Sequence, residues 1–197
     1  MFTGLVAQMG RVSEITSQSV GARIEIEAGS VADRLRIGDS LAINGCCLTV
    51  IEKVGTTVSF DAGEETLQRT NLGELSQQSA VNLETSIAAG AAMGGHFVTG
   101  HIDATGTVDS RSDDGDWTVL WFRVPEQLTR QMASKGSVAV DGVSLTLVDV
   151  EQTRFSVALI PHTLSVTTLG ARQVGHTVNI ETDVLAKYVE RQLEFRD

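Results

Sequence analysis

Short runs in which hydrophobic and polar residues alternate dominate this chain. The alternating runs are residues 23–27, 57–61, 81–84, 117–124, 137–140, 155–160 and 178–180. Such alternation predicts β-strands with one buried face and one exposed face. About six short strands per half of the chain, separated by Gly-marked turns, favour a small closed antiparallel barrel, because closure removes exposed strand edges.

Three segments carry helical patterns instead. Residues 31–35 and 126–132 occupy corresponding places before two similar strands, and we expect each to close one barrel end. The only longer helix that the pattern predicts covers residues 184–196, where Leu185, Tyr188 and Phe195 fall on a three-four spacing. This helix has no counterpart earlier in the chain, so it either caps the second barrel or joins subunits.

The chain contains an internal duplication. Residues 43–50 return as 140–147 in a shared G-x-x-L-T frame, with Gly45 aligned to Gly142 at an offset of 97 (142 − 45). Three further blocks repeat in the same order: 3–6 as 99–102, 65–73 as 162–170, and 81–85 as 178–182. The sequence therefore predicts an all-β protein of two tandem barrels, residues 1–95 and 96–183, with a C-terminal α-helix over 184–197. Residues 88–95, rich in Ala and Gly, are the expected linker.

Composition and charge exclude several classes of function. The net charge of −10 argues against a nucleic-acid partner, because such binding needs clustered Lys and Arg to neutralise phosphates. No apolar run approaches the roughly 20 residues of a membrane helix, and no secretory signal is visible at the start, so we expect a cytoplasmic protein without membrane contact. The linker glycines lack the βαβ surroundings of a dinucleotide fold.

The two cysteines are adjacent, at positions 46 and 47. A disulfide between neighbours is strained, and two thiols without further Cys make no zinc site, so at least one free thiol in a reducing compartment is expected. Cys47 lies in an apolar strand, where a cysteine is either a small buried hydrophobe or a nucleophile.

Among the histidines, His101 is the candidate for acid–base chemistry. It stands where the first copy has the apolar Leu5, so a titratable group has replaced a hydrophobic one. His96, His162 and His176 have no acidic or cysteine neighbours in a metal-binding pattern, and we interpret them as surface or turn residues.

Ser144 and Thr146 lie two residues apart and share a strand face, as Cys47 and Thr49 do in the first copy. Paired side chains of this kind suit a polar ligand. No G-x-S-x-G elbow surrounds Ser144, so a hydrolase triad is not supported. Lys135 precedes its strand opposite Gly38 and is interpreted as a solvated end. These residues alone indicate a duplicated barrel that binds two similar small molecules, and the Cys47/Ser144 difference implies unequal chemistry at the two sites.

Five motifs together resemble one family. They are residues 1–6 (MFTGLV), 44–50 (NGCCLTV), 94–101 (GGHFVTGH), 141–146 (DGVSLT) and 167–170 (TTLG). Each motif is weak alone, but in this order over nearly the whole chain they are similar to the riboflavin synthases of the alpha-subunit type.

The resemblance implies a homotrimer of chains, each made of two six-stranded Greek-key barrels and a C-terminal helix that joins the subunits. It implies the dismutation of two 6,7-dimethyl-8-ribityllumazine molecules into riboflavin and 5-amino-6-(D-ribitylamino)uracil, without cofactor or metal. The two pockets that face each other would come from the first barrel of one subunit and the second barrel of its neighbour. Association with lumazine synthase is a further possible partnership.

The resemblance also implies the site residues. For chemistry it favours Cys47 and His101, with Ser40 and Thr146 as weaker assistants. The expected first pocket is lined by Gly4, Leu5, Val6, Cys47, Leu48, Thr49, Asp61, Ala62, Gly63, Glu64, Glu65 and Thr66. The expected second pocket is lined by Gly100, His101, Ile102, Lys135, Ser144, Leu145, Thr146, Ala158, Leu159, Ile160, Pro161, His162 and Thr163. The chain departs from the family pattern at two positions. The family has Glu before the Thr-Leu of both copies, whereas here Glu65 is matched by His162, and Leu5 replaces a frequent Ile.

A non-catalytic protein of the lumazine- or flavin-binding antenna type is the alternative. Such relatives tend to lose the cysteine and the second pocket, whereas this chain keeps Cys47, His101 and Ser144. A flavin-dependent reductase would need a nucleotide-binding domain, for which no residues remain.

Overall fold

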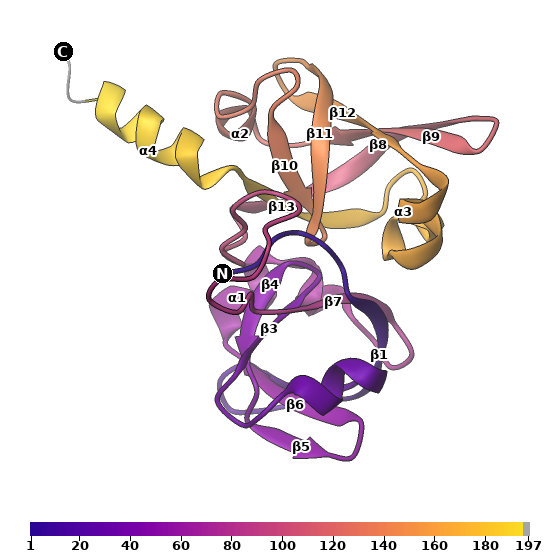
Figure 1. Cartoon of the computed structure of the whole chain (residues 1–197), viewed down its shortest axis with the longest axis vertical. Coiled ribbons are helices and arrows are strands. Elements are labelled where there is room, and N and C mark those ends of the chain that lie inside the picture. Colours follow the sequence, from indigo (N-terminus) through magenta and orange to yellow (C-terminus); the bar gives the residue numbers. More distant parts are fainter. Residues whose placement is uncertain (195–197) are drawn as a thin grey trace.

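Two β-barrels, one from each half of the chain, form the computed structural model, which describes residues 1–194 (Figure 1). The first barrel contains β1 (Gln8–Ser17), β2 (Ala22–Glu27), β3 (Ser40–Ile43), β4 (Cys46–Thr49), β5 (Glu52–Val54), β6 (Thr57–Ala62) and β7 (Ala80–Thr85). These strands pair in the order β4-β3-β7-β1-β2-β6-β5. Every pairing is antiparallel.

The second barrel is closed. It contains β8 (Ala104–Asp114), β9 (Trp117–Arg123), β10 (Ser137–Val140), β11 (Val143–Val150), β12 (Arg154–Leu159) and β13 (Thr177–Thr182). Their order is β10-β11-β12-β9-β8-β13, and β13 pairs with β10 to complete the ring. The duplicated all-β architecture predicted from the repeat is thus confirmed. Closure is found only in the second half, because the first half, which we still call the first barrel, is a curled seven-stranded sheet with β4 and β5 at its edges.

The two barrels differ at one strand. The first barrel has seven strand segments because the strand that matches β11 is interrupted after Thr49 and becomes β4 and β5. At the interruption Ile51 N still donates to Ser59 O of β6, at 3.0 Å, so the chain continues along the same path.

Short helices lie between the strands. They are η1 (Gly29–Arg34), α1 (Glu64–Arg69), η2 (Asn71–Glu74), α2 (Glu126–Thr129), α3 (Pro161–Val166) and η3 (Thr168–Ala171). η1 and α2 fall in the two regions predicted to be helical, and each contributes buried side chains such as Val31 and Leu128 to its barrel core. The six-residue helices α1 and α3 were not predicted from the sequence, because one and a half turns carry too little periodicity to recognise.

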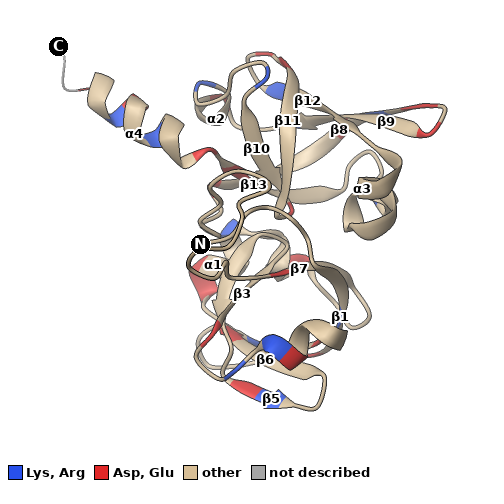
Figure 2. Cartoon of the chain, viewed as in Figure 1, with Lys and Arg blue, Asp and Glu red and all other residues tan. Residues whose placement is uncertain are grey.

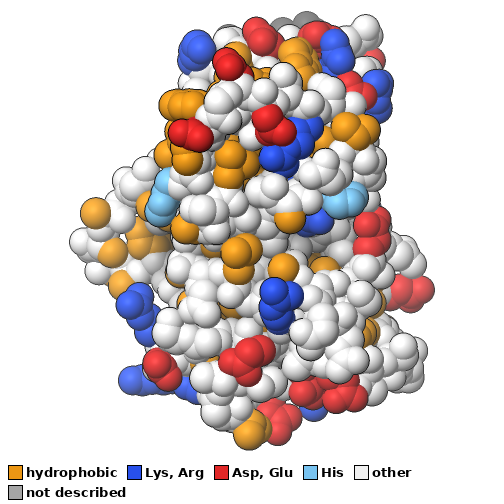
Figure 3. Space-filling model, turned by 90° about the vertical axis from the view of Figure 1, so that its right-hand side faces the viewer, with side chains coloured by type: hydrophobic (Ala, Val, Ile, Leu, Met, Phe, Trp, Pro, Cys, Tyr) orange, Lys and Arg blue, Asp and Glu red, His pale blue; other side chains and the backbone are white. Residues whose placement is uncertain are grey.

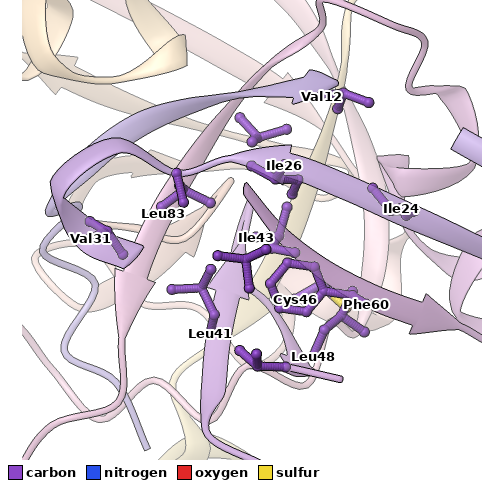
Figure 4. Close-up of a cluster of buried hydrophobic side chains, with 14 of the residues drawn as sticks. Val12, Ile24, Ile26, Val31, Leu41, Ile43, Cys46, Leu48, Phe60 and Leu83 are labelled. Atoms are coloured by element: carbon purple, nitrogen blue, oxygen red, sulfur yellow. The ribbon is translucent and has the colours of Figure 1, made fainter. Parts of the chain in front are cut away.

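Strand alternation builds the core. Cys46 and Leu48 of β4 point into the first barrel, where Cys46 lies beside Phe60 (Figure 4). Cys47 and Thr49 consequently point outward, and their shared outer face confirms the prediction that Cys47, not Cys46, is the thiol on the face of Thr49.

Helix α4 (Val184–Leu193) begins at Asp183, whose carboxylate accepts a hydrogen bond from Leu185 N at 3.0 Å. It is held to the second barrel near its base by a 2.7 Å ion pair between Lys187 and Asp103. One turn further on, Gln131 Nε2, just after α2, donates to the Glu190 carboxylate, and the end of the helix projects outward from the second barrel (Figure 1). Its larger apolar side chains are exposed: Leu185, Tyr188, Val189 and Leu193. The helix therefore does not cap the second barrel, and its role in joining subunits stays a prediction; Phe195 lies outside the described residues.

Charged side chains of both signs are spread over the surface (Figures 2 and 3). They include an acidic tip on the β8–β9 hairpin, formed by Asp113, Asp114 and Asp116 (Figure 2). Within residues 1–194, none of the helices is long and apolar enough to cross a membrane.

The repeated motif forms the contact between the barrels. Asn44-Gly45 connects β3 to β4 and Asp141-Gly142 connects β10 to β11, each as a two-residue hairpin. All four residues have positive φ, at 46°, 80°, 46° and 78°, as the tight turns of two-residue hairpins require. The turns meet back to back: a β-carbon on Gly45 would lie 2.7 Å from Gly142 N, and one on Gly142 would lie 2.7 Å from Gly45 N.

A buried polar network surrounds this contact. Asn82 Nδ2 of β7 donates to Asp141 O across the interface, and Asn179 Nδ2 of β13 donates to Asn44 O, both at 2.9 Å. The two bonds are related by the duplication, since Asn82 and Asn179 align in the repeat. The barrels are thus fixed to each other by an approximate twofold arrangement within one chain.

Candidate functional site

Two equivalent carboxylates hold the segments that precede the first strand of each barrel, at Thr3-Gly4 and at Thr99-Gly100. Glu84 of β7 accepts hydrogen bonds from Thr3 N and Thr3 Oγ1, both at 2.7 Å, and from Gly4 N at 3.0 Å. Glu181 of β13 accepts the matching three bonds from residues 99 and 100, at 2.6, 2.7 and 2.9 Å. Burial raises the pKa of the Glu84 carboxyl, and the hydrogen bonds from Thr3 and Gly4 oppose that rise.

The anchored segments cross to the opposite barrel. Ser144 N of β11 donates to Gly4 O at 2.8 Å, and Cys47 N of β4 donates to Gly100 O at 2.9 Å. Both approaches need glycine, because a β-carbon on Gly4 or Gly100 would lie 2.5 Å from the β-carbon of Ser144 or Cys47 respectively. Each glycine also has a positive φ, 77° for Gly4 and 83° for Gly100.

This crossing corrects the grouping expected from the sequence. Val6 packs against the core of the second barrel and Ile102 against the core of the first. Gly4 and Val6 therefore contact the second barrel, whereas Gly100 and Ile102 contact the first. Leu5 between them lines a cleft with Ser40 of the first barrel, as the sequence predicted. From the sequence, we expected each segment to contact the barrel that follows it in the chain. The repeat itself does not show which barrel a segment contacts.

We call the outer surface around Cys47 and Thr49 the Cys47 face. His101 is exposed beside it, directly after Gly100. The bond from Cys47 N to Gly100 O places the backbone of His101 one residue away from β4, and a joint role of Cys47 and His101 in chemistry stays a prediction. Asp61 lies on the outer side of the neighbouring β6 and pairs with Arg23 at 3.2 Å. Gly63, Glu64, Glu65 and Thr66 follow at the start of α1.

We call the outer surface around Ser144 and Thr146 the Ser144 face. Ala158 and Ile160 are exposed at the end of the adjacent strand β12, and Pro161, His162 and Thr163 begin α3. The two faces are therefore built from equivalent elements. They differ chemically in the pairs Cys47/Ser144 and Glu65/His162.

Some predicted lining residues point the other way. Leu48, Ala62 and Leu159 are buried in the barrel cores, and Leu145 packs against the second core. A ligand on either outer face would meet only their backbone atoms.

Ser40 and Lys135 lie at the margins of these faces. Ser40 pairs with Thr49 across β3 and β4, and it lines a cleft of about 540 Å³ together with Leu5. Lys135 is exposed and has a φ of 69°, a left-handed conformation that its counterpart Gly38 also adopts, at 91°. The turn before β10 requires this conformation, as the equivalent turn does at Gly38, and a ligand contact by Lys135 stays a prediction. A second cleft, of about 500 Å³ between the barrels, contains none of the predicted site residues.

The two thiols differ in environment. Burial raises the pKa of the Cys46 thiol to about 12, so this side chain behaves as a small core hydrophobe. Cys47 is only partly buried, and both thiols are free. Cys47 packs against a small apolar cluster of Phe2, Ala42, Val98 and Ala139, and its role as a nucleophile stays a prediction.

Sequence reasoning missed His96. It was interpreted as a surface or turn residue, but it is buried, and its Nδ1 lies 2.7 Å from Ser144 Oγ. Burial lowers the pKa of the His96 ring. The nearest signal in the sequence was Gly94-Gly95 before it, which permits a close approach: a β-carbon on Gly95 would lie 2.0 Å from Thr3 O. In the described part of the chain, no cluster of three metal-ligating side chains is found.

Comparison with known proteins gives the family. A model of the lumazine binding domain matches residues 3–86 and again 99–183, the two halves of the duplication. The chain is 44% identical over 195 residues to riboflavin synthase of Mycobacterium tuberculosis, covering 97% of each chain. The chain belongs to the riboflavin synthase family. Its members also include the enzyme of Actinobacillus pleuropneumoniae, 41% identical with 98% of this chain and 90% of that one covered. The enzyme of Brucella abortus is 39% identical over 201 residues, with both chains covered completely.

Solved structures agree with this assignment. LumP in complex with 6,7-dimethyl-8-(1′-D-ribityl)lumazine superposes with a TM-score of 0.84 at 26% identity, covering 92% of this chain and 99% of LumP. LumP in complex with riboflavin gives a TM-score of 0.85 at 29% identity, with the same coverage. The family resemblance stated from the sequence motifs is confirmed.

Proposed function

We propose that this protein is a riboflavin synthase that converts two molecules of 6,7-dimethyl-8-ribityllumazine into riboflavin and 5-amino-6-(D-ribitylamino)uracil. The observation that carries the proposal is the identity of 39 to 44% to riboflavin synthases over 97 to 100% of this chain. The enzyme class is that of a transferase, since a four-carbon unit moves from one lumazine to the other.

The duplicated geometry supports a reaction between two copies of one compound. Each barrel presents an equivalent outer face, reached by an equivalent glycine segment from the other half of the chain. Holding two identical rings in defined orientations removes much of the entropic cost of a bimolecular step. Two similar faces with unequal side chains also allow one lumazine to donate the four carbons and the other to accept them.

Named residues fit the required steps. The donor and acceptor steps need removal of a proton from the acidic 7-methyl group of one lumazine and addition of a nucleophile to the other. Cys47 offers a partly buried free thiol as the nucleophile, and His101 an exposed imidazole for proton transfer on the same face. Ser40, at the margin of the Cys47 face, and Thr146, on the Ser144 face, would assist by hydrogen bonding.

The assembly we propose is a homotrimer in which the first barrel of one subunit meets the second barrel of the next. The exposed apolar side of α4 supports contact with other copies, because Leu185, Tyr188, Val189 and Leu193 form a continuous apolar stripe that would otherwise remain in water. We also propose a cytoplasmic location and association with lumazine synthase. The free thiols of Cys46 and Cys47 are in keeping with a reducing compartment.

A non-catalytic lumazine-binding protein is the second candidate, favoured by the fold shared with LumP in its lumazine complex. Incubation of the purified protein with the lumazine alone separates the two candidates. The visible spectrum should change from that of lumazine to that of riboflavin, and a sample without protein provides the control. Lumazine that is bound but unchanged would contradict the proposed activity and support the second candidate.

A further inference from the structure

His96 connects the linker to the Ser144 face. Residues 91–95 and Phe97 are exposed around it, yet the His96 side chain is only 9% exposed. Its backbone N donates to Thr3 O at 3.2 Å, and its ring reaches Ser144 Oγ. Gly95 allows this approach, because a β-carbon there would lie 3.1 Å from Ser144 Oγ.

The surroundings of the ring determine which nitrogen carries the proton. His96 Nε2 is buried without a hydrogen-bond partner in residues 1–194. A buried N–H without an acceptor is rarer in proteins than a buried acceptor without a donor. A proton on Nδ1 leaves only an acceptor, Nε2, without a partner, and it lets Nδ1–H donate to Ser144 Oγ across 2.7 Å.

We propose that His96 is a positioning residue that makes Ser144 a hydrogen-bond donor to the bound ligand. Because Ser144 Oγ accepts the bond from His96, its own O–H is free to point toward the outer face that Thr146 shares. The matching ligand group is an acceptor, a carbonyl oxygen or a ring nitrogen of a heteroaromatic molecule. This inference rests on the proposed function, since it takes the Ser144 face as a lumazine site.

Cys47, at the equivalent position in the first barrel, has no hydrogen bond of this kind within residues 1–194. Cys47 N makes the same backbone bond to Gly100 O that Ser144 N makes to Gly4 O. Yet the Cys47 thiol has no hydrogen-bond partner in the part of the chain that the structure describes. The histidine thus adds a directed donor to one face and leaves a thiol on the other.

The hydrogen bond between His96 and Ser144 can be tested by the Kd for riboflavin, measured by fluorescence titration of the full-length protein. His96→Leu and Ser144→Ala should each raise the Kd by about fivefold, as expected for one lost hydrogen bond. The double variant should also be weakened about fivefold rather than about 25-fold, because both changes remove the same interaction. His96→Asn, whose amide N–H can replace Nδ1–H, should bind within about twofold of the unaltered protein, a rescue that a merely space-filling role would not produce.

His176→Leu is the matched control, since this exposed histidine uses its Nδ1 only to accept from Gln173 N at 3.1 Å. Fully multiplicative losses in the double variant, or His96→Asn as weak as His96→Leu, would overturn the proposal. Nitrogen NMR of the labelled imidazole needs no ligand and no variant: the proton should be found on Nδ1, and a proton on Nε2 would overturn the assignment. Failure to convert lumazine, with these results intact, would contradict only the proposed activity.

Discussion

Gly45 and Gly142 face each other across the junction of the barrels so closely that no side chain fits on either. The G-x-x-L-T repeat is therefore more than a trace of duplication, because its glycines are the point at which the copies touch. The adjoining turns place Cys47 and Ser144 at equivalent positions on the two outer faces.

The first prediction concerns this contact. Gly45→Ala should lower the free energy of unfolding by about 2 to 4 kcal/mol, because it combines an unfavourable positive φ with a backbone clash. Urea unfolding measures the loss. Gly38→Ala is the control, since Gly38 has a φ of 91° but open space around its α-carbon. An equal loss in both variants would show that the φ angle alone is responsible and that the barrels do not meet here.

The second prediction concerns the buried carboxylate of Asp141. Burial raises the pKa of Asp141, while Arg172, which reaches it at 2.6 Å, opposes that rise. Arg172→Leu should cost about 3 to 5 kcal/mol near neutral pH, because a buried charge loses its partner. Without the arginine the carboxyl takes up a proton more readily in the folded state than in the unfolded state. The cost of this variant should therefore shrink as the pH is lowered.

The first copy supplies the rescue for that variant. It has Asn44 and Leu75 in the places of Asp141 and Arg172, and Asn44 Nδ2 donates to Asn71 Oδ1 at 3.3 Å. The residue aligned with Asn71 is Thr168, whose Oγ1 is buried without a partner among residues 1–194. The double variant D141N/R172L should therefore recover most of the lost stability. A double variant as unstable as Arg172→Leu would contradict this account of the network.

The third prediction separates the two thiols. Iodoacetamide at about pH 8 should modify Cys47 in the native protein and leave Cys46 unmodified, because alkylation requires an accessible thiolate. Mass spectrometry should find one modified cysteine, and Cys47→Ser should abolish the reaction until the protein is unfolded.

The buried thiol of Cys46 also makes stability depend on pH. Above the ordinary thiol pKa of 9.0, the unfolded chain ionises Cys46, while the folded chain holds it protonated up to a pKa of about 12. Stability should consequently fall as the pH rises through that range. Native labelling of Cys46 would contradict its place in the core.

The fourth prediction concerns α4. A chain that ends after Asp183 loses the exposed Leu185, Tyr188, Val189 and Leu193. It should sediment as a monomer, whereas the full chain should sediment as the proposed trimer. Both barrels should remain folded, since the helix contributes no residue to either buried core within residues 1–194. A truncated chain that still sedimented as a trimer would contradict the proposed role of the helix.

Much of this structure was predictable, because the two copies of the repeat show the same pattern of strands and turns. Alternation predicted β2, β6, β7, β9, β10, β12 and β13, and their boundaries agree to within a few residues, as for residues 57–61 and β6. It did not predict the long strands β1 and β8, because an irregularity in each, after Val12 and after Val108, interrupts the period of two. The face shared by Cys47 and Thr49 followed from the same period of two. The break between β4 and β5 did not, because an irregular step in one strand leaves no mark on the hydrophobic pattern.

The partners of the site segments could not be predicted. A repeat shows that Gly4 and Gly100 are equivalent, but either could contact its own barrel or the other one. The crossing depends on three-dimensional packing of glycine against Ser144 and Cys47. His96 was missed for a related reason, since its partner Ser144 lies 48 residues away in the sequence.

The central claim is that two equivalent faces of one chain do unequal work. Turnover of the lumazine by Cys47→Ser and by Ser144→Ala, measured in the same assay over substrate concentrations that reach saturation, tests it most directly. The account predicts a far larger loss of kcat for Cys47→Ser, because the thiol is assigned to bond formation. Ser144→Ala should chiefly raise KM, because the hydroxyl is assigned to ligand binding. Equal losses of kcat in the two variants would contradict a distinct role for the cysteine.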